Sequence, residues 1–280
     1  MPYCEVADGV RLYHEDFGEG PAVVFTASGS QTHQMWENQV AALSDRYRTV
    51  AYDWRGTGAS DKPRTGYTAD TAASDLCALI ERLALAPATL VGHGIGNHLS
   101  ILAATRRPDL VAGVVLVSAA PWFTGTRDGV AGGLSREFMD LLARGSPLGD
   151  ARGVAYAQIW AELSERLLFH RPQHPAIHQS ILEQALCWPP FVINAYAKSL
   201  NAIDHRERLH LIRCPALIVH GRHDRKTLYE GAEFMARKIR NARFVTLEDS
   251  AHMGQIEEIN AFNAALTDFL ASVQSARRAA

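Results

Sequence analysis

The sequence predicts an α/β fold class, with a mostly parallel sheet that is covered by helices on both faces. Apolar runs of strand length alternate with segments of helical spacing over most of the chain, and this alternation is typical of parallel strands joined by helical crossovers. The length of 280 residues suits one large domain that carries an insertion. With 47% hydrophobic and 21% charged residues, the chain can bury a sizeable core beneath an ordinary charged surface.

The first part of the chain contains five predicted strands and three predicted helices. Residues 10–18 alternate between apolar and polar types, which favours a half-exposed strand. Continuous apolar runs favour buried parallel strands, and such runs occupy 21–27, 47–53, 88–92 and 111–120. Apolar residues at helical spacing predict helices over 33–43, 72–83 and 95–106.

The regular alternation stops between residues 122 and 199, where helical patterns and many aromatic residues occur without a clear buried strand. It resumes with strands predicted over 214–221 and 242–248, a helix between them, and a final amphipathic helix over 261–273. We therefore expect residues 1–121 and 200–280 to form a core domain, and residues 122–199 to form a helical cap.

The charge pattern argues against several kinds of partner. The formal net charge is −2 and no long run of like charge occurs, so a surface for nucleic acid is not expected. The N-terminal residues include no signal-type apolar segment, and no membrane binding is predicted. The expected partner is a small-molecule substrate, and the composition is compatible with a homodimer.

The cysteine spacing indicates reduced thiols in a cytoplasmic protein. The four cysteines are scattered along the chain without any CxxC pair. No metal site and no cofactor are therefore predicted.

Four predicted strand ends carry the residues of a candidate site. Active sites in parallel sheets lie beyond the carboxyl ends of the strands. The segments directly after four of the apolar runs are 28–30, 92–96, 221–224 and 249–252. Together they offer serines and glycines, a carboxylate and a histidine.

The motifs at these strand ends resemble those of the α/β-hydrolase superfamily, and the resemblance covers nearly the whole chain. "LVGHGIG" is similar to the strand-to-helix elbow that carries the nucleophile in a G-x-S-x-G pattern. "LIVHGRHD" resembles the acid segment, "DSAHM" the histidine loop, and "YDWRGTGASDKP" the stretch after the fourth strand. The resemblance implies an α/β-hydrolase fold: a mostly parallel eight-stranded sheet flanked by helices, with the helical cap inserted after strand 6.

The resemblance also implies roles for particular residues. Asp224 is expected to orient His252, the catalytic base, by accepting the imidazole Nδ1–H. The expected oxyanion hole consists of the backbone N–H groups of Gly29 and Ile95. Ser28 and Ser30 are expected at the pocket, where their hydroxyl groups can meet a polar substrate. Alternatively, both are ordinary turn residues. His93 flanks the elbow, where the family often has histidine.

Gly94 is the main departure from the family pattern, because it stands where the pattern has serine. Glycine has no nucleophilic atom, so an acyl-enzyme cannot form at this position. Ser28 is the best candidate for a substitute nucleophile.

Three explanations of Gly94 remain open. The protein can be an enzyme whose His252–Asp224 dyad acts as a general base without covalent catalysis, as a lyase, cyclase, cofactor-free oxygenase or water-activating enzyme of natural-product or aromatic metabolism. It can be a serine ester, lactone or C–C hydrolase with an engineered Ser-to-Gly change. It can also be a catalytically silent ligand-binding protein.

The aromatic residues of the cap predict an apolar or aromatic substrate. The expected pocket residues are Trp122, Trp160, Trp188 and Phe191, although each could instead belong to the cap's own core. His98, which lies one helical turn after Gly94, can face the pocket or pack against the sheet, and packing is the favoured interpretation.

Overall fold

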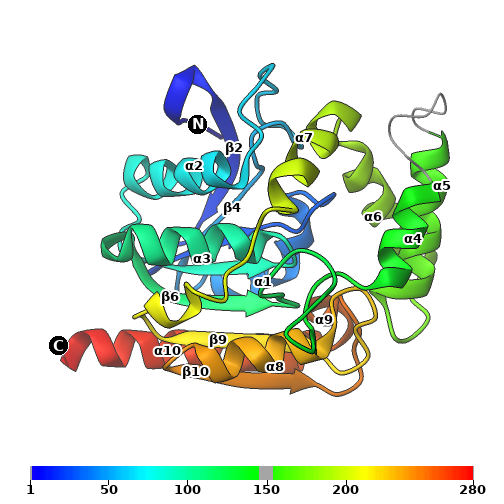
Figure 1. Ribbon diagram of the computed structural model, residues 1–280. Helices are drawn as coiled ribbons and strands as arrows, with labels where there is room; N and C mark the ends of the chain where they lie inside the picture. Colours follow the sequence, from blue (N-terminus) through cyan, green and yellow to red (C-terminus); the bar gives the residue numbers. More distant parts are fainter. Residues whose placement is uncertain (1, 145–153, 280) are drawn as a thin grey trace.

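The computed structural model describes residues 2–144 and 154–279, and its centre is an eight-stranded sheet (Figure 1). The strand order is β1-β2-β4-β3-β5-β6-β9-β10. The bounds are β1 (Tyr3–Glu5), β2 (Arg11–Phe17), β3 (Ala22–Thr26), β4 (Arg48–Tyr52), β5 (Ala88–His93), β6 (Val111–Val117), β9 (Ala216–Gly221) and β10 (Ala242–Leu247). Six neighbouring strands pair in parallel, in the spatial order β4-β3-β5-β6-β9-β10. Strands β1 and β2 are antiparallel to their neighbours. The predicted α/β fold class, with a mostly parallel eight-stranded sheet flanked by helices, is confirmed.

The strand order creates a crevice at the carboxyl end of β3. This strand lies between β4 and β5, so the chain passes to one side of β3 and then returns to the other. Ligands bind at such reversal points in open parallel sheets. The loop that follows β3 and the turn that follows β5 meet there. All side chains of β3 and β5 are buried, as expected for strands covered on both faces.

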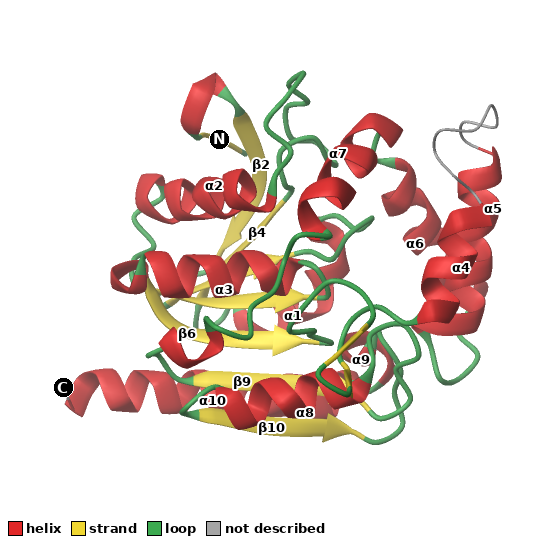
Figure 2. Cartoon of the chain, in the orientation of Figure 1, coloured by secondary structure: helices red, strands yellow, loops and turns green. Residues whose placement is uncertain are grey.

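Helices cover both faces of the sheet (Figure 2). Helices α2 (Ala69–Arg82), α3 (Gly96–Arg106) and α8 (Tyr229–Lys238) lie on one face, and α1 (Glu37–Leu43) and α10 (Ile259–Ala279) lie on the other. A short helix, α9 (Gly254–Glu257), precedes α10. The predicted helix over 33–43 is divided, because its first part is a 3-10 helix, His33–Trp36.

Four further helices lie beyond the carboxyl ends of the strands, within the segment predicted to form the cap (Figure 1). They are α4 (Arg136–Arg144), α5 (Val154–Leu163), α6 (Pro175–Leu186) and α7 (Pro190–Leu200). Residues 145–153, which belong to the same predicted segment, lie outside the described residues.

The segment before α4 contains a short hairpin that the sequence does not indicate. Strands β7 (Thr126–Arg127) and β8 (Val130–Ala131) pair in antiparallel fashion and are not buried, which agrees with the expectation that residues 122–199 contain no clear buried strand. The hairpin packs against α8 of the core, since a Cβ atom at Gly231 of α8 would lie 2.6 Å from the carbonyl oxygen of Gly132. Two-residue strands are too short to show an alternating pattern, which is why the sequence does not reveal them.

Candidate active site

The turn from β5 into α3 holds Gly94 in a conformation that favours glycine. Its φ is +53°, in the left-handed region. The side-chain amide of Asn97 donates to the carbonyl oxygens of Gly94 (2.9 Å) and Val117 (2.7 Å), which ties the turn to the neighbouring strand β6. A Cβ atom built at residue 94 would lie 2.5 Å from Ser28 Oγ and 3.6 Å from His252 Nε2. Ser28, His252 and residue 94 therefore meet at one point.

Asp224 and His252 form a buried pair at the ends of β9 and β10. The Nδ1 atom of His252 lies 2.8 Å from Asp224 Oδ2. The other carboxylate oxygen, Oδ1, accepts the backbone N–H groups of Lys226 and Thr227, both at 2.9 Å. His220 Nε2 lies 3.4 Å from Oδ2. These contacts fix the carboxylate, so that it in turn fixes the orientation of the imidazole.

The surroundings shift both pKa values downwards. Burial raises the pKa of Asp224, but the charge of His252 and hydrogen bonds from His220 and His252 outweigh burial and hold this pKa below its usual range. Burial and the positive charge of Lys226 lower the pKa of His252 to about 4, against the opposing effect of Asp224. His252 is therefore neutral at physiological pH and able to accept a proton.

The backbone of His252 is held from the opposite side. His93 Nε2 and Ser118 Oγ each lie 2.9 Å from the carbonyl oxygen of His252. The rings of His93 and His252 meet edge to face, with 4.7 Å between their centroids. By contrast, His252 Nε2 is buried and has no hydrogen-bond partner among the described residues. Hydrogen bonds to Nδ1 and to the backbone carbonyl, together with the ring of His93, hold the imidazole in place. Nε2 is the ring nitrogen left available to a bound molecule.

Gly29 and Ile95, the residues expected to supply backbone N–H donors, lie beside the same space. Gly29 and Ile95 are in close contact, because a Cβ atom at Gly29 would lie 2.5 Å from Ile95 Cδ1. Both residues line the cavity. Neither N–H group donates a hydrogen bond within the part of the chain that the structure describes. Unpaired N–H groups of this kind can bind an oxygen atom that carries negative charge.

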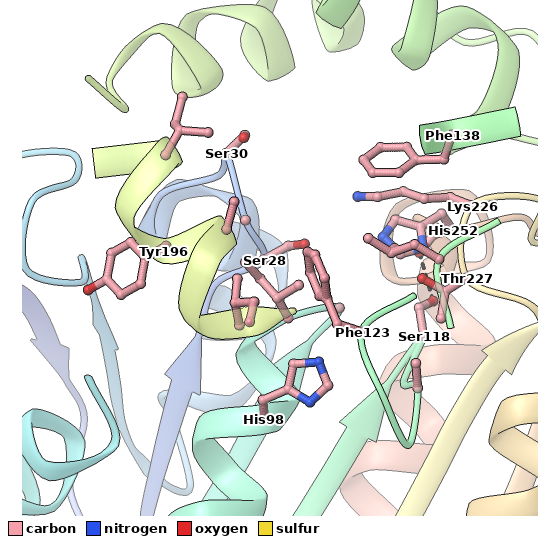
Figure 3. Close-up of a pocket in the computed structure, with 18 of the residues that line it drawn as sticks. Ser28, Ser30, His98, Ser118, Phe123, Phe138, Tyr196, Lys226, Thr227 and His252 are labelled. Atoms are coloured by element: carbon pink, nitrogen blue, oxygen red, sulfur yellow. Dashed lines mark hydrogen bonds between the residues drawn. The ribbon is translucent and has the colours of Figure 1, made fainter. Parts of the chain in front are cut away.

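These groups open into a cavity of about 100 Å³ between the sheet and the four outer helices (Figure 3). Since one buried water needs roughly 10–15 Å³, the cavity is large enough for a small organic molecule. His252, Gly94, Ser28 and Ser30 line one part of it. The remaining wall is mainly apolar, with Phe123, Leu134, Phe138, Trp160, Trp188 and Tyr196.

Several predicted pocket residues do not line this cavity. Trp122 is fully buried, but it packs against Phe234 of α8 and donates its indole N–H to the carbonyl oxygen of Gly125. Phe191 is 51% exposed, because it lies on the outer side of α7 beside Tyr67. His93 lies behind His252 and contacts its backbone instead of the cavity. Trp160 and Trp188 do line the cavity.

His98 follows the less favoured of its two expected placements, because it faces the pocket. It lines the cavity, and its Nδ1 atom lies 3.0 Å from Nε2 of His205. Burial lowers the pKa of His98 to about 4, so its ring contributes no charge at physiological pH.

Sequence reasoning missed further cavity residues, among them Ser118, Phe123, Phe138, Lys226 and Thr227. Ser118 directly follows the apolar run of β6, so the rule that identified the other strand ends could have identified it as well. Lys226 lies two residues after Asp224, where the sequence offers no sign that a lysine turns inward. Among the described residues, no group of three or more His, Cys, Asp or Glu side chains could hold a metal ion. None of the helices described is both long enough and apolar enough to cross a membrane.

Comparisons with known proteins agree with this fold. Residues 21–259 match the family model for the alpha/beta hydrolase fold. A non-heme chloroperoxidase from Streptomyces lividans is 30% identical over 90% of this chain and 93% of its own. An esterase from Exiguobacterium antarcticum superposes with a TM-score of 0.86 at 28% identity, covering 95% of this chain and 98% of the esterase. An enol-lactonase from Burkholderia xenovorans LB400 gives a TM-score of 0.82 at 27% identity, covering 96% and 100%.

Proposed function

This chain belongs to the alpha/beta hydrolase family and is an enzyme of that family; from this premise we propose that His252 and Asp224 act as a general base without a covalent intermediate. The observation that carries the proposal is the buried, unpartnered Nε2 atom of His252, which faces a residue without a side chain. Gly94 stands at the position of the family's nucleophile and offers no atom to attack a substrate.

In the proposed reaction, His252 acts on water or directly on a C–H or O–H group of the substrate. In the hydrolytic form, Nε2 removes a proton from water, the water oxygen bonds to the substrate carbonyl carbon, and the carbonyl electrons move to its oxygen. When that intermediate collapses, the leaving oxygen takes the proton back from the imidazolium. Asp224 stabilises the imidazolium in between and holds Nδ1 protonated.

The backbone N–H groups of Gly29 and Ile95 are the proposed donors to the charged oxygen of the intermediate. Both are free to donate, and both border the space next to His252. Donors that are fixed in place before reaction typically contribute a factor of about 10²–10³ in rate.

An ester or lactone is the first substrate class to test, because an esterase and an enol-lactonase are among the similar proteins. The apolar wall of the cavity suits a small substrate with an aliphatic or aromatic body. Simple 4-nitrophenyl esters and unsubstituted lactones are therefore suitable probes.

The proposal is tested by hydrolysis of these probes together with covalent labelling. The wild-type protein should turn over at least one probe, and mass spectrometry after treatment with a fluorophosphonate should detect no adduct. The variants His252→Ala and Asp224→Asn should each lower kcat/KM by about 10²–10⁴, the usual contribution of a general base.

Ser28→Ala is the matched control for a hidden nucleophile. It should keep most of the activity, whereas an acyl or phosphonyl adduct on Ser28 in the wild type would contradict the proposal. Turnover that survives in His252→Ala would also contradict it.

A further inference from the structure

Lys226 is a charged side chain inside the cavity that the proposed reaction does not use. The residue is only 6% exposed, although it carries an ammonium group. Its Nζ atom lies 5.1 Å from the centre of the Phe138 ring and 5.8 Å from that of Trp160. Figure 3 shows the side chain extending into the pocket, between Phe138 and His252. Burying an ammonium is costly unless something compensates its charge.

No carboxylate compensates this ammonium directly. The residues that line the cavity include no Asp and no Glu. Among the described residues, none of the ion pairs and none of the side-chain hydrogen bonds involves Nζ of Lys226. Asp224 is close in sequence, but its oxygens accept from two backbone N–H groups and face His252 and His220. Among the described residues, the two aromatic faces and the more distant negative charge of Asp224 stabilise the ammonium only in part, because burial still lowers the pKa of Lys226.

We propose that Lys226 binds a carboxylate group of the substrate, whose remaining part is apolar and lies against the aromatic wall. This inference rests on the proposed function, since it names the substrate class of the same site. A carboxylate fits better than a phosphate for two reasons. The cavity presents a single cation, without an arginine fork to share a dianion. The volume of about 100 Å³ also leaves little room for a phosphate group beside an apolar body.

The position of Lys226 also links binding to the strength of the base. The charged groups that face His252 are Asp224 and Lys226, and the neighbouring rings are those of His220 and His93. Burial lowers the pKa of Lys226 to about 8, so a bound anion would favour the protonated amine. The anion would also cancel the charge that lowers the pKa of His252. A substrate with a carboxylate would therefore meet a stronger base than a neutral analogue would.

The test compares acids with their amides. Acetate, propionate, phenylacetate and 3-phenylpropionate are titrated into the wild-type protein, each beside its primary amide, and binding is followed by calorimetry and tryptophan fluorescence. At least one acid should bind about 10-fold or more tightly than its amide, the effect of one charge-assisted contact. The variant Lys226→Met, which keeps an unbranched side chain, should remove this preference. Lys226→Arg should retain part of it.

Arg225→Met is the matched control, because Arg225 lies on the same loop but outside the cavity, paired with Glu137. It should leave the acid preference unchanged. If no acid binds better than its amide, or if Lys226→Met keeps the preference, the proposal is wrong. Phenyl phosphate binding more tightly than every acid would also overturn it. If Lys226 served only the fold, its replacement would lower the melting temperature, and the wild-type protein would show no preference for acids over amides.

The two proposals fail separately. His252→Ala should bind the acids with the same preference as the wild type, because the base does not take part in charge recognition. Acid preference without any turnover would therefore refute only the proposed function. Turnover that depends on His252, with equal binding of acids and amides, would refute only the role of Lys226.

Discussion

Gly94 and Ser28 share one small space next to His252. A side chain at residue 94 would begin 2.5 Å from Ser28 Oγ, which is too close, but 3.5 Å from Ser28 Cβ, which is an ordinary contact. The hydroxyl of Ser28 therefore occupies the place that a side chain at residue 94 would need. The backbone of Gly94 adds a second obstacle, since its φ of +53° is unfavourable for residues with a Cβ atom.

We predict that Gly94→Ser alone lowers stability and reacts poorly, and that the double variant Gly94→Ser/Ser28→Ala reacts better. The left-handed backbone should cost about 1–2 kcal/mol in either variant. The double variant should form a fluorophosphonate adduct at position 94 several-fold faster than the single variant, because the introduced hydroxyl can approach His252.

Gly94→Ala is the control for this experiment, since it carries the backbone cost without the hydroxyl. Urea unfolding measures the stability of all three variants, and mass spectrometry measures labelling. Equal labelling rates in the single and double variants would show that Ser28 does not obstruct the space.

At the residue scale, the sequence predicts the residues that follow fixed motifs but not the direction of isolated side chains. Asp224 and His252 stand in recognisable segments after strands, and they form the expected hydrogen bond. Trp122 and Trp160 are both aromatic residues of the predicted cap, and the sequence does not distinguish them. Trp122 packs on α8, whereas Trp160 lines the cavity. Lys226 could not be predicted, because a lysine in a loop is normally solvent-exposed.

At the scale of elements, hydrogen bonds join α6 and the turn that follows it to the loop after β3. The indole N–H of Trp188 donates to the carbonyl oxygen of Gln31 at 2.8 Å. The side-chain oxygen of Gln184, on α6, accepts the backbone N–H of Thr32 at 3.2 Å. The same loop contains Gly29, so these bonds fix the position of one proposed oxyanion donor.

We predict that Trp188→Phe lowers kcat more than it raises KM. The substitution keeps an aromatic ring in place but leaves the carbonyl group of Gln31 without its donor, at a stability cost of about 1 kcal/mol. The loop then holds Gly29 less firmly, which should reduce kcat several-fold with the probe esters.

Trp54→Phe is a matched control, because Trp54 packs against Trp188 but its indole N–H has no hydrogen-bond partner among the described residues. Its kcat should remain near the wild-type value. Equal losses in both variants would mean that ring volume, and not the hydrogen bond, matters here.

The same scale shows why most elements could be predicted and some could not. The buried strands are continuous apolar runs, and their positions agree with the sequence interpretation to within a few residues. Strand β1 pairs only along one edge and spans Tyr3–Glu5, which is too short to give a periodic signal. The apolar pattern predicts that the last helix ends near residue 273, but α10 continues to Ala279. The final turns are polar, so hydrophobic periodicity does not reveal them, although polar residues form helical backbone hydrogen bonds equally well.

At the scale of the whole molecule, buried histidines link stability to pH. Burial lowers the pKa values of His14, His93, His98, His205 and His252. The unfolded chain takes up protons at these residues below about pH 6.5, whereas the folded protein does not, so stability falls as the pH decreases. His33 acts in the opposite direction, because Asp53 and Glu15 overcome the effect of burial and raise its pKa.

We predict that the free energy of unfolding decreases from pH 6.5 towards pH 5. Each histidine whose folded pKa is near 4 should contribute about 1.4 kcal/mol per pH unit in this range. Urea unfolding at pH 7.5, 6.5 and 5.5 measures the slope. His98→Gln should make the slope shallower, whereas replacing the exposed His210 by glutamine should leave it unchanged. An identical slope in His98→Gln would contradict this account.

The order of the site residues along the chain has a consequence for synthesis. Gly29, Gly94 and Ile95 belong to the first strands, whereas Asp224, Lys226 and His252 follow β9 and β10, with the outer helices between the two groups. A nascent chain that has reached residue 250 already carries the two proposed backbone donors, but it still lacks His252, the proposed base. Under the proposed mechanism, the enzyme acquires reactivity only when the final part of the chain emerges and α10 closes over the sheet.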